Sequence, residues 1–173
     1  YVTRSVFEMQ MHYLSTRYQV VGLEELTGML QRDSLLPRNI CAITFDDGWK
    51  DNYAHAFPIL KKYKLPATVF VVTGRVGTLG AFWPDEVCRR LTALPHGRRR
   101  RLADQLGAGP GDPTEAALAH LKAVPESERE ALLEALRAGT PRPVEAEREL
   151  LDWDELAHMA AAGIDVESHG ATH

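Results

Sequence analysis

The sequence is poor in cysteine, has no large excess of charge of one sign and contains no long hydrophobic run. Its two cysteines, Cys41 and Cys88, are too few for a disulfide framework, and we expect two separate buried thiols. The net charge of −4 gives no general reason to expect binding to nucleic acid or to an anionic membrane. No apolar run approaches the roughly 20 residues that a membrane-spanning helix needs. We therefore expect no nucleic-acid partner and no transmembrane segment in this chain.

The first residues lack a starting methionine, and they lack the charged and apolar regions of a signal peptide. We expect the chain to begin inside a longer protein, so the missing signal indicates little about its compartment. The length of 173 residues suggests one domain, which can bury a real core. A content of 45% hydrophobic and 25% charged residues is ordinary for a globular protein.

The most informative stretch is residues 40–49, where an apolar run ends in two adjacent carboxylates and a glycine. The β-branched, apolar residues 40–45 predict a buried strand of a parallel sheet that is covered on both faces. Asp46 and Asp47 then lie at the carboxyl end of that strand, which is where α/β folds place their chemistry. Gly48 allows a sharp turn. The simpler interpretation is a strand that ends in a polar turn, with no function attached.

Helical and strand patterns alternate around this stretch. Apolar periodicity and capping signals predict helices at about 3–14, 23–30, 57–63 and from 152, and strands at 18–21, 67–73 and 164–168. A strand, a helix and a strand in close succession are typical of a parallel crossover unit. Gly74, Gly77 and Gly80 follow the strand at 67–73, but they match no phosphate-binding fingerprint.

The segment from about 82 to 150 differs in composition, because alanine, leucine, arginine and glutamate dominate it. Asp112 before Pro113 is typical of a helix start, and other start and stop signals recur. We interpret the segment as a helical insertion between strands. Its four consecutive arginines, 98–101, fit a solvated helix face, and contact with an anion or a polymer is the second interpretation.

His169 and His173 follow the predicted strand at 164–168 and are four residues apart. Two such histidines can bind one cation, although most pairs with this spacing are surface coincidences. Here the pair follows a strand, as the two aspartates do, and the carboxyl ends of parallel strands lie at one edge of a sheet. A third ligand from Asp46 or Asp47 would complete a His₂–carboxylate set with open positions for water and substrate.

The two motifs together resemble a known family. TFDDG at 44–48 and SHGATH at 168–173 resemble the NodB-homology domain of polysaccharide deacetylases, also called carbohydrate esterase family 4. Residues 57–63 and 66–71 are similar to the first helix and second strand of that domain, and residues 153–163 are similar to its run into the histidine motif. The pattern of residues 7–26 resembles bacterial members that act on exopolysaccharide. The resemblance covers nearly the whole chain.

The resemblance implies an α/β fold, namely an incomplete, distorted (β/α) barrel that carries the helical insertion. It implies a single domain over residues 1–173 and metal-dependent removal of N-acetyl groups from polysaccharide that contains N-acetylglucosamine. Asp47, His169 and His173 would bind a divalent metal ion, with zinc as the first expectation, and Asp46 would be the general base. It also suggests a place of action outside the cytoplasm or at the cell envelope.

Two departures from the family pattern matter. Gly170 stands where the family often has serine or threonine, which removes a loop hydrogen bond but no ligand. The family's later motifs, which supply a groove wall, an acetyl pocket and a general acid, have no counterpart before the last residue, His173. We therefore expect the chain to represent the N-terminal part of the domain and to be inactive by itself.

Two other functions remain open at this point. One is a related hydrolase on the same scaffold that acts on O-acetyl sugars or on small cyclic amides. The other is a glycan-binding module that keeps a metal site without catalysis. The sequence identifies neither the polymer nor its linkage.

Overall fold

The computed structural model describes residues 2–32, 35–79, 82–141 and 148–172. The chain forms two compact units, and the second is inserted into the first. Unit 1 comprises residues 1–79 and 148–173, and unit 2 comprises residues 80–147. That the whole chain counts as one domain stays a prediction.

Unit 1 begins with two helices and a short pair of parallel strands. Helix α1, Arg4–Arg17, starts where the Thr3 side chain accepts a hydrogen bond from the Val6 N–H, as the sequence indicated. Strand β1, Gln19–Val20, precedes helix α2, Leu23–Gln31. Strand β1 pairs in parallel with β2, Ile40–Cys41.

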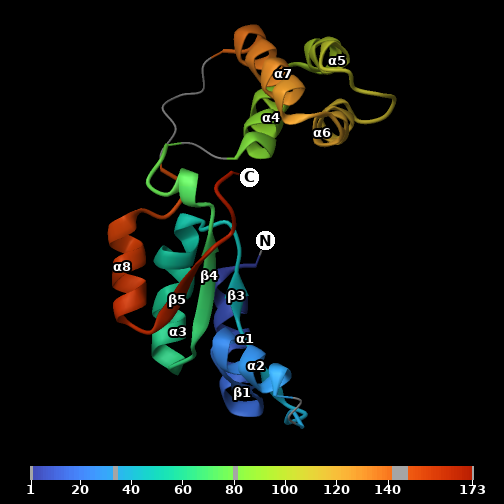
Figure 1. Ribbon diagram of the computed structural model, residues 1–173. Coiled ribbons are helices and arrows are strands. Elements are labelled where there is room, and N and C mark those ends of the chain that lie inside the picture. Colours follow the sequence, from blue (N-terminus) through green and yellow to red (C-terminus); the bar gives the residue numbers. More distant parts are fainter. Residues whose placement is uncertain (1, 33–34, 80–81, 142–147, 173) are drawn as a thin grey trace. The chain divides into compact units, whose positions relative to one another are not determined.

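The main sheet of unit 1 has three parallel strands, and both chemical motifs follow its strands (Figure 1). Strands β3, Thr44–Phe45, β4, Ala67–Val71, and β5, Ile164–Ser168, lie in the order β3-β4-β5. The register aligns Phe45 with Val69 and Val69 with Val166. The prediction that both motif-bearing strands end at the same edge of one sheet is therefore confirmed.

The prediction of one strand over residues 40–45 is wrong. The chain changes hydrogen-bonding partners inside this run: Cys41 O accepts from Val21 N–H, whereas Ile43 O accepts from Thr68 N–H. Two short strands in two sheets result. The run is also not fully buried, because Cys41 is half-buried. Cys88, in helix α4 (Trp83–Thr92) of unit 2, is half-buried as well. The expectation of two buried thiols is therefore wrong.

Three helices cover one face of the main sheet and form the core of unit 1 with it. Helices α1, α3 (Phe57–Tyr63) and α8 (Trp153–Ala161) contribute to this core, and Val69 on the central strand is completely buried. Helix α8 begins with the predicted capping box between Asp152 and Glu155. A π-helical turn, Asn52–Ala56, precedes α3.

The described residues of unit 2, 82–141, form four helices with a separate apolar core. Helices α4 (Trp83–Thr92), α5 (His96–Gln105), α6 (Pro113–Ala123) and α7 (Glu126–Gly139) pack around leucines that include Leu91, Leu106, Leu121 and Leu136. The helices predicted for this segment are therefore confirmed. Within the described residues, no helix of either unit is long and apolar enough to cross a membrane.

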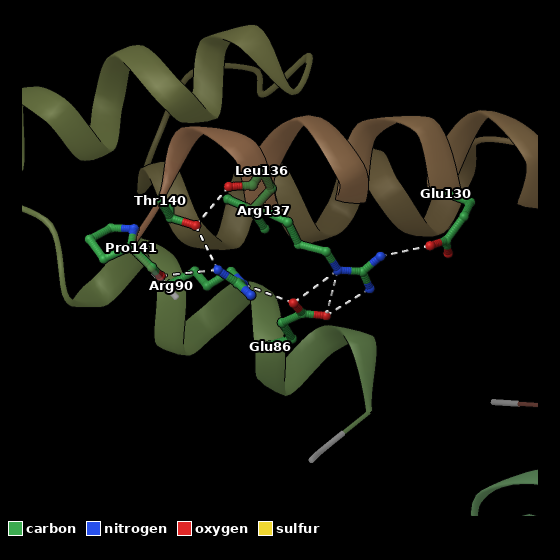
Figure 2. A network of polar contacts seen from close by, with 7 residues as sticks. All are labelled: Glu86, Arg90, Glu130, Leu136, Arg137, Thr140 and Pro141. Atoms are coloured by element: carbon green, nitrogen blue, oxygen red, sulfur yellow. Dashed lines mark hydrogen bonds and ion pairs between the residues drawn. The ribbon is translucent and has the colours of Figure 1, made fainter. Parts of the chain in front are cut away.

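An ion-pair network joins α4 to α7 in unit 2 (Figure 2). Arg137 donates to both carboxylate oxygens of Glu86 and to Glu130. Arg90 donates to Glu86 and to the Thr140 hydroxyl, and this hydroxyl in turn donates to Leu136 O. These charge-assisted hydrogen bonds lower the pKa of the Glu86 carboxyl, chiefly through Arg137.

The arginine run on α5 has a structural use. Arg98 donates to Gly139 O, Arg99 to the carbonyls at the end of α4, and Arg100 to the carbonyls of Gly109 and Gly111. Three of the four guanidinium groups thus bind backbone carbonyls. The two sequence interpretations, a solvated helix face and contact with an anion or a polymer, did not include this role.

Candidate functional site

The Asp46–Asp47–Gly48 segment makes a tight turn directly after β3. Gly48 N–H donates to Asp46 O over 2.9 Å, so the turn closes on three residues, as in a γ-turn. Asp47 has φ 70° and Gly48 has φ 76°. The left-handed region is costly for a residue with a side chain, and such conformations concentrate at functional sites. The turn therefore marks Asp47 as a residue whose placement matters.

Neighbouring segments hold this turn from two sides. A Cβ atom on Gly48 would lie 2.9 Å from Cγ1 of Val71, so the end of β4 packs directly against the glycine. On the other side, Leu151 N–H donates to Gly48 O over 2.8 Å, and Lys50 N–H donates to Glu149 O over 2.7 Å. The turn is thus fixed between strand β4 and the segment that enters helix α8.

Arg148 anchors that segment to the start of α8. Its guanidinium donates to Glu155 Oε2 over 2.7 Å, to Glu155 Oε1 over 2.9 Å and to Leu150 O over 2.6 Å. This bidentate contact with the carboxylate lowers the pKa of Glu155 and raises the pKa of Arg148. The contact ties the chain around Leu150 to the capping box of α8.

His169 leaves the end of β5 beside the aspartate turn. Its N–H donates to Val71 O over 2.8 Å, which continues the pairing of β5 with β4. Its Nε2 atom lies 3.7 Å from Oδ1 of Asp47, and the side chains are 44% and 24% exposed. The Phe70 ring lies 6.5 Å from the His169 ring, centre to centre. Asp47 and His169, which the sequence predicted as ligands, are therefore brought together.

The spacing of these two atoms suits a shared metal ion. A separation of 3.7 Å is too long for a direct hydrogen bond. Two atoms that each bind zinc at about 2.1 Å with a tetrahedral angle lie about 3.4 Å apart. A carboxylate and an imidazole are also ligand types that zinc accepts. The two residues thus fit the divalent ion that the sequence predicted.

The other predicted site residues stand as follows. Asp46 is exposed at the start of the turn, one residue from Asp47. His173, the predicted third ligand, lies outside the described residues. Over the part of the chain that the structure describes, no group of three or more His, Cys, Asp or Glu side chains could hold a metal ion. The three-ligand set therefore stays a prediction.

Sequence reasoning missed two residues next to His169. Thr73 was interpreted as the last residue of a strand and Gly74 as the start of a loop, yet both donate hydrogen bonds to the segment that follows His169. A glycine directly after the predicted strand 67–73 is the signal that was available, because glycine there often marks a close approach of two backbones.

A comparison with known protein families gives a match to the polysaccharide deacetylase model over residues 35–173. The chain belongs to the polysaccharide deacetylase family. The matched region contains both the aspartate turn and the histidine segment. The family predicted from the two motifs is therefore confirmed.

Two curated relatives are similar to part of this chain. A putative polysaccharide deacetylase of Bacillus subtilis, YxkH, is 39% identical over 77 residues, which are 44% of this chain and 28% of the relative. The poly-β-1,6-N-acetyl-D-glucosamine N-deacetylase of Staphylococcus aureus is 39% identical over 77 residues, 44% of this chain and 26% of the relative. The matched part is thus about a quarter of the length of these polysaccharide deacetylases.

A solved deacetylase shares the fold. The structure of the Streptococcus pyogenes deacetylase PplD in complex with acetate matches with a TM-score of 0.51 and 18% identity. The match covers 97% of this chain and 45% of that one. This likeness confirms the predicted fold class, an α/β fold of the polysaccharide deacetylase type.

Proposed function

We propose that the protein containing this chain hydrolyses N-acetyl groups of polysaccharide that contains N-acetylglucosamine. Its membership in the polysaccharide deacetylase family supports this, as does its partial similarity to a relative named for N-deacetylation of poly-β-1,6-N-acetyl-D-glucosamine. The observation that carries the proposal is the 3.7 Å separation of His169 Nε2 and Asp47 Oδ1 at the shared edge of the sheet.

In this proposal Asp47, His169 and His173 hold a divalent metal ion, and we propose zinc. The ion, when bound, supplies a Lewis acid that polarises the acetyl carbonyl and lowers the pKa of a bound water to about 7. Asp47 contributes a negative oxygen and His169 a neutral nitrogen, so both ligands must be deprotonated. The fixed turn and the paired end of β5 hold these two side chains in place before metal arrives.

Asp46 acts as the general base in this proposal. Its exposed carboxylate can accept a proton on Oδ from the water that attacks the acetyl carbon. The carbon–nitrogen bond then breaks, the sugar nitrogen gains a proton, and acetate and a free amine are the products. Asp46 is exposed whereas Asp47 is half-buried in the turn, so the two aspartates are suited to different roles.

The test is acetate release by the complete encoded protein. We expect release from N-acetylglucosamine oligomers, loss of release after treatment with a chelator, and recovery when zinc is added back. Acetylated xylan and ureides are the comparison substrates. Faster hydrolysis of either one would contradict the proposal in favour of an esterase or a cyclic-amide hydrolase. Binding of oligomers without acetate release would favour a glycan-binding module.

We also propose that this reaction takes place outside the cytoplasm or at the cell envelope. The support is the Staphylococcus aureus relative, whose named substrate is a polysaccharide. Fractionation of cells that express the complete protein tests this, and recovery only with cytoplasmic markers would contradict it.

A further inference from the structure

The end of strand β4 contacts both segments that carry the proposed ligands. On the aspartate side, the Val71 side chain packs against Gly48, where a Cβ atom would come within 2.9 Å of it. On the histidine side, Val71 O accepts the hydrogen bond of the His169 N–H over 2.8 Å. One short stretch of backbone therefore lies between the Asp47 turn and the His169 segment.

Thr73 and Gly74 continue this contact beyond the last paired residue of β4. Thr73 N–H donates to Gly170 O over 2.9 Å, and the Thr73 hydroxyl donates to the same oxygen over 3.1 Å. Gly74 N–H donates to Ala171 O over 3.1 Å. Three hydrogen bonds thus hold the two residues that directly follow His169, where Gly170 itself has φ 93°.

The approach at Gly74 leaves no room for a side chain. A Cβ atom built on Gly74 would lie 2.5 Å from Ala171 O, which is shorter than real contacts of this kind. The oxygen belongs to the backbone, so it cannot rotate away as the end of a flexible side chain can. A side chain at residue 74 must therefore push the segment after His169 away from β4.

We propose that Thr73 and Gly74 are positioning residues that hold His169 at the distance from Asp47 which metal binding requires. The inference rests on the proposed function, because it assigns to these residues an effect on the affinity of that same metal site. It differs from a general role in folding, because both residues act on the segment from 169 to 172 and neither belongs to the core of unit 1. Backbone contacts next to a ligand fix its direction in the way that outer-shell hydrogen bonds do.

The test uses four variants of the complete protein. Gly74→Ala introduces the Cβ atom, Thr73→Val removes the hydroxyl donor, and Thr73→Ser keeps it. Gly97→Ala is the matched glycine control, because a Cβ atom on Gly97 would meet no atom within 4 Å. Each protein is titrated with zinc, and amide hydrogen exchange of the peptide that contains residues 169–172 is measured without metal.

We expect Gly74→Ala to weaken zinc binding by about 10- to 100-fold, which is typical of a lost outer-shell contact. Thr73→Val should weaken it less, and Thr73→Ser should restore affinity close to that of the unaltered protein. Amide hydrogen exchange of the peptide that contains residues 169–172 should be faster in Gly74→Ala and in Thr73→Val. Gly97→Ala should change neither the zinc affinity nor the exchange rate. Unchanged affinity and unchanged exchange in Gly74→Ala would overturn the inference.

The two measurements separate this inference from the proposed function. If the unaltered protein binds no zinc or other divalent ion, the proposed metal centre fails, and so does the effect on affinity. Faster exchange in Gly74→Ala would then still support the positioning of the segment. If the unaltered protein binds zinc and Thr73→Ser is as impaired as Thr73→Val, the hydroxyl hydrogen bond has no positioning role.

Discussion

At the scale of single residues, the site depends on backbone conformations that only a few residue types tolerate. The sequence predicted a turn at Asp47–Gly48, because glycine permits it and aspartate is common in turns. It also singled out Asp46, Asp47 and His169. It could not predict the 3.7 Å approach of Asp47 to His169, because a spacing across two strands depends on the register of the sheet.

Gly74 shows a different limit of sequence reasoning. Its partner segment is far away in the sequence: the Thr73 hydroxyl and Gly170 O are 97 residues apart. The local pattern around Gly74 shows only a glycine after a strand. The need for glycine appears when the backbone of Ala171 is placed beside it.

Glu86 gives a prediction about pH at this scale. Arginine partners, Arg137 first, lower the pKa of its carboxyl in the folded protein. Its contribution to stability is therefore present above the unfolded pKa of about 4.3 and is lost as pH falls through the lower folded value. The unaltered protein should lose stability when the pH is lowered from neutral to acidic, and we expect Glu86→Gln to lose less. Urea unfolding at the two pH values measures the free energy of unfolding of each protein.

The matched control is Glu134→Gln on α7, since Glu134 is exposed and has no ion pair among the described residues. Glu134→Gln should leave the pH dependence of the unfolding midpoint as it was. Equal pH dependence in Glu86→Gln and the unaltered protein would contradict a stabilising role for the network of Figure 2.

At the scale of elements, the predictions succeeded where a single local pattern decides the structure. Helix α3 and strand β5 have the predicted bounds, and the capping signals at Asp112 and Asp152 begin helices as expected. The prediction of one strand over residues 40–45 failed because composition can indicate a strand but cannot indicate which strand it pairs with. Residues 40–41 pair with β1, and residues 44–45 pair with β4. This change of partner depends on where the neighbouring strands lie, which the residues of the run do not determine.

The arginine run on α5 provides a prediction about helix ends. Arg99 donates to the carbonyls of Leu91, Thr92 and Leu94 over 3.0, 3.0 and 3.1 Å. Leu91 and Thr92 are in the last turn of α4 and Leu94 follows it, so the guanidinium group caps the end of this helix. We expect Arg99→Met, which keeps most of the apolar stem, to lower the free energy of unfolding of unit 2 by about 1–3 kcal/mol.

Arg101→Met is the control for this effect, because Arg101 is exposed and has no hydrogen bond or ion pair within the described ranges. Denaturant unfolding of the two variants gives the comparison. A loss of stability in Arg101→Met as large as that in Arg99→Met would show that the effect comes from net charge and not from capping.

At the scale of the whole molecule, two units have separate apolar cores, and the described site contacts lie within unit 1. The predicted family and the α/β class are confirmed by the match over residues 35–173 and by the fold of a solved deacetylase. The roles of Asp46, Asp47, His169 and His173 stay predictions, since they concern a metal ion and a substrate. The proposed activity of the complete protein depends on these roles.

The division of work between the two aspartates is tested most directly by zinc content and acetate release in two variants of the complete protein, Asp46→Asn and Asp47→Ala. Removing a ligand should abolish zinc binding, so Asp47→Ala should lose both metal and activity. Asp46→Asn should keep zinc and lose activity by about 10²- to 10⁴-fold, the usual contribution of a general base. Loss of zinc in Asp46→Asn together with retention of zinc in Asp47→Ala would contradict the proposed roles.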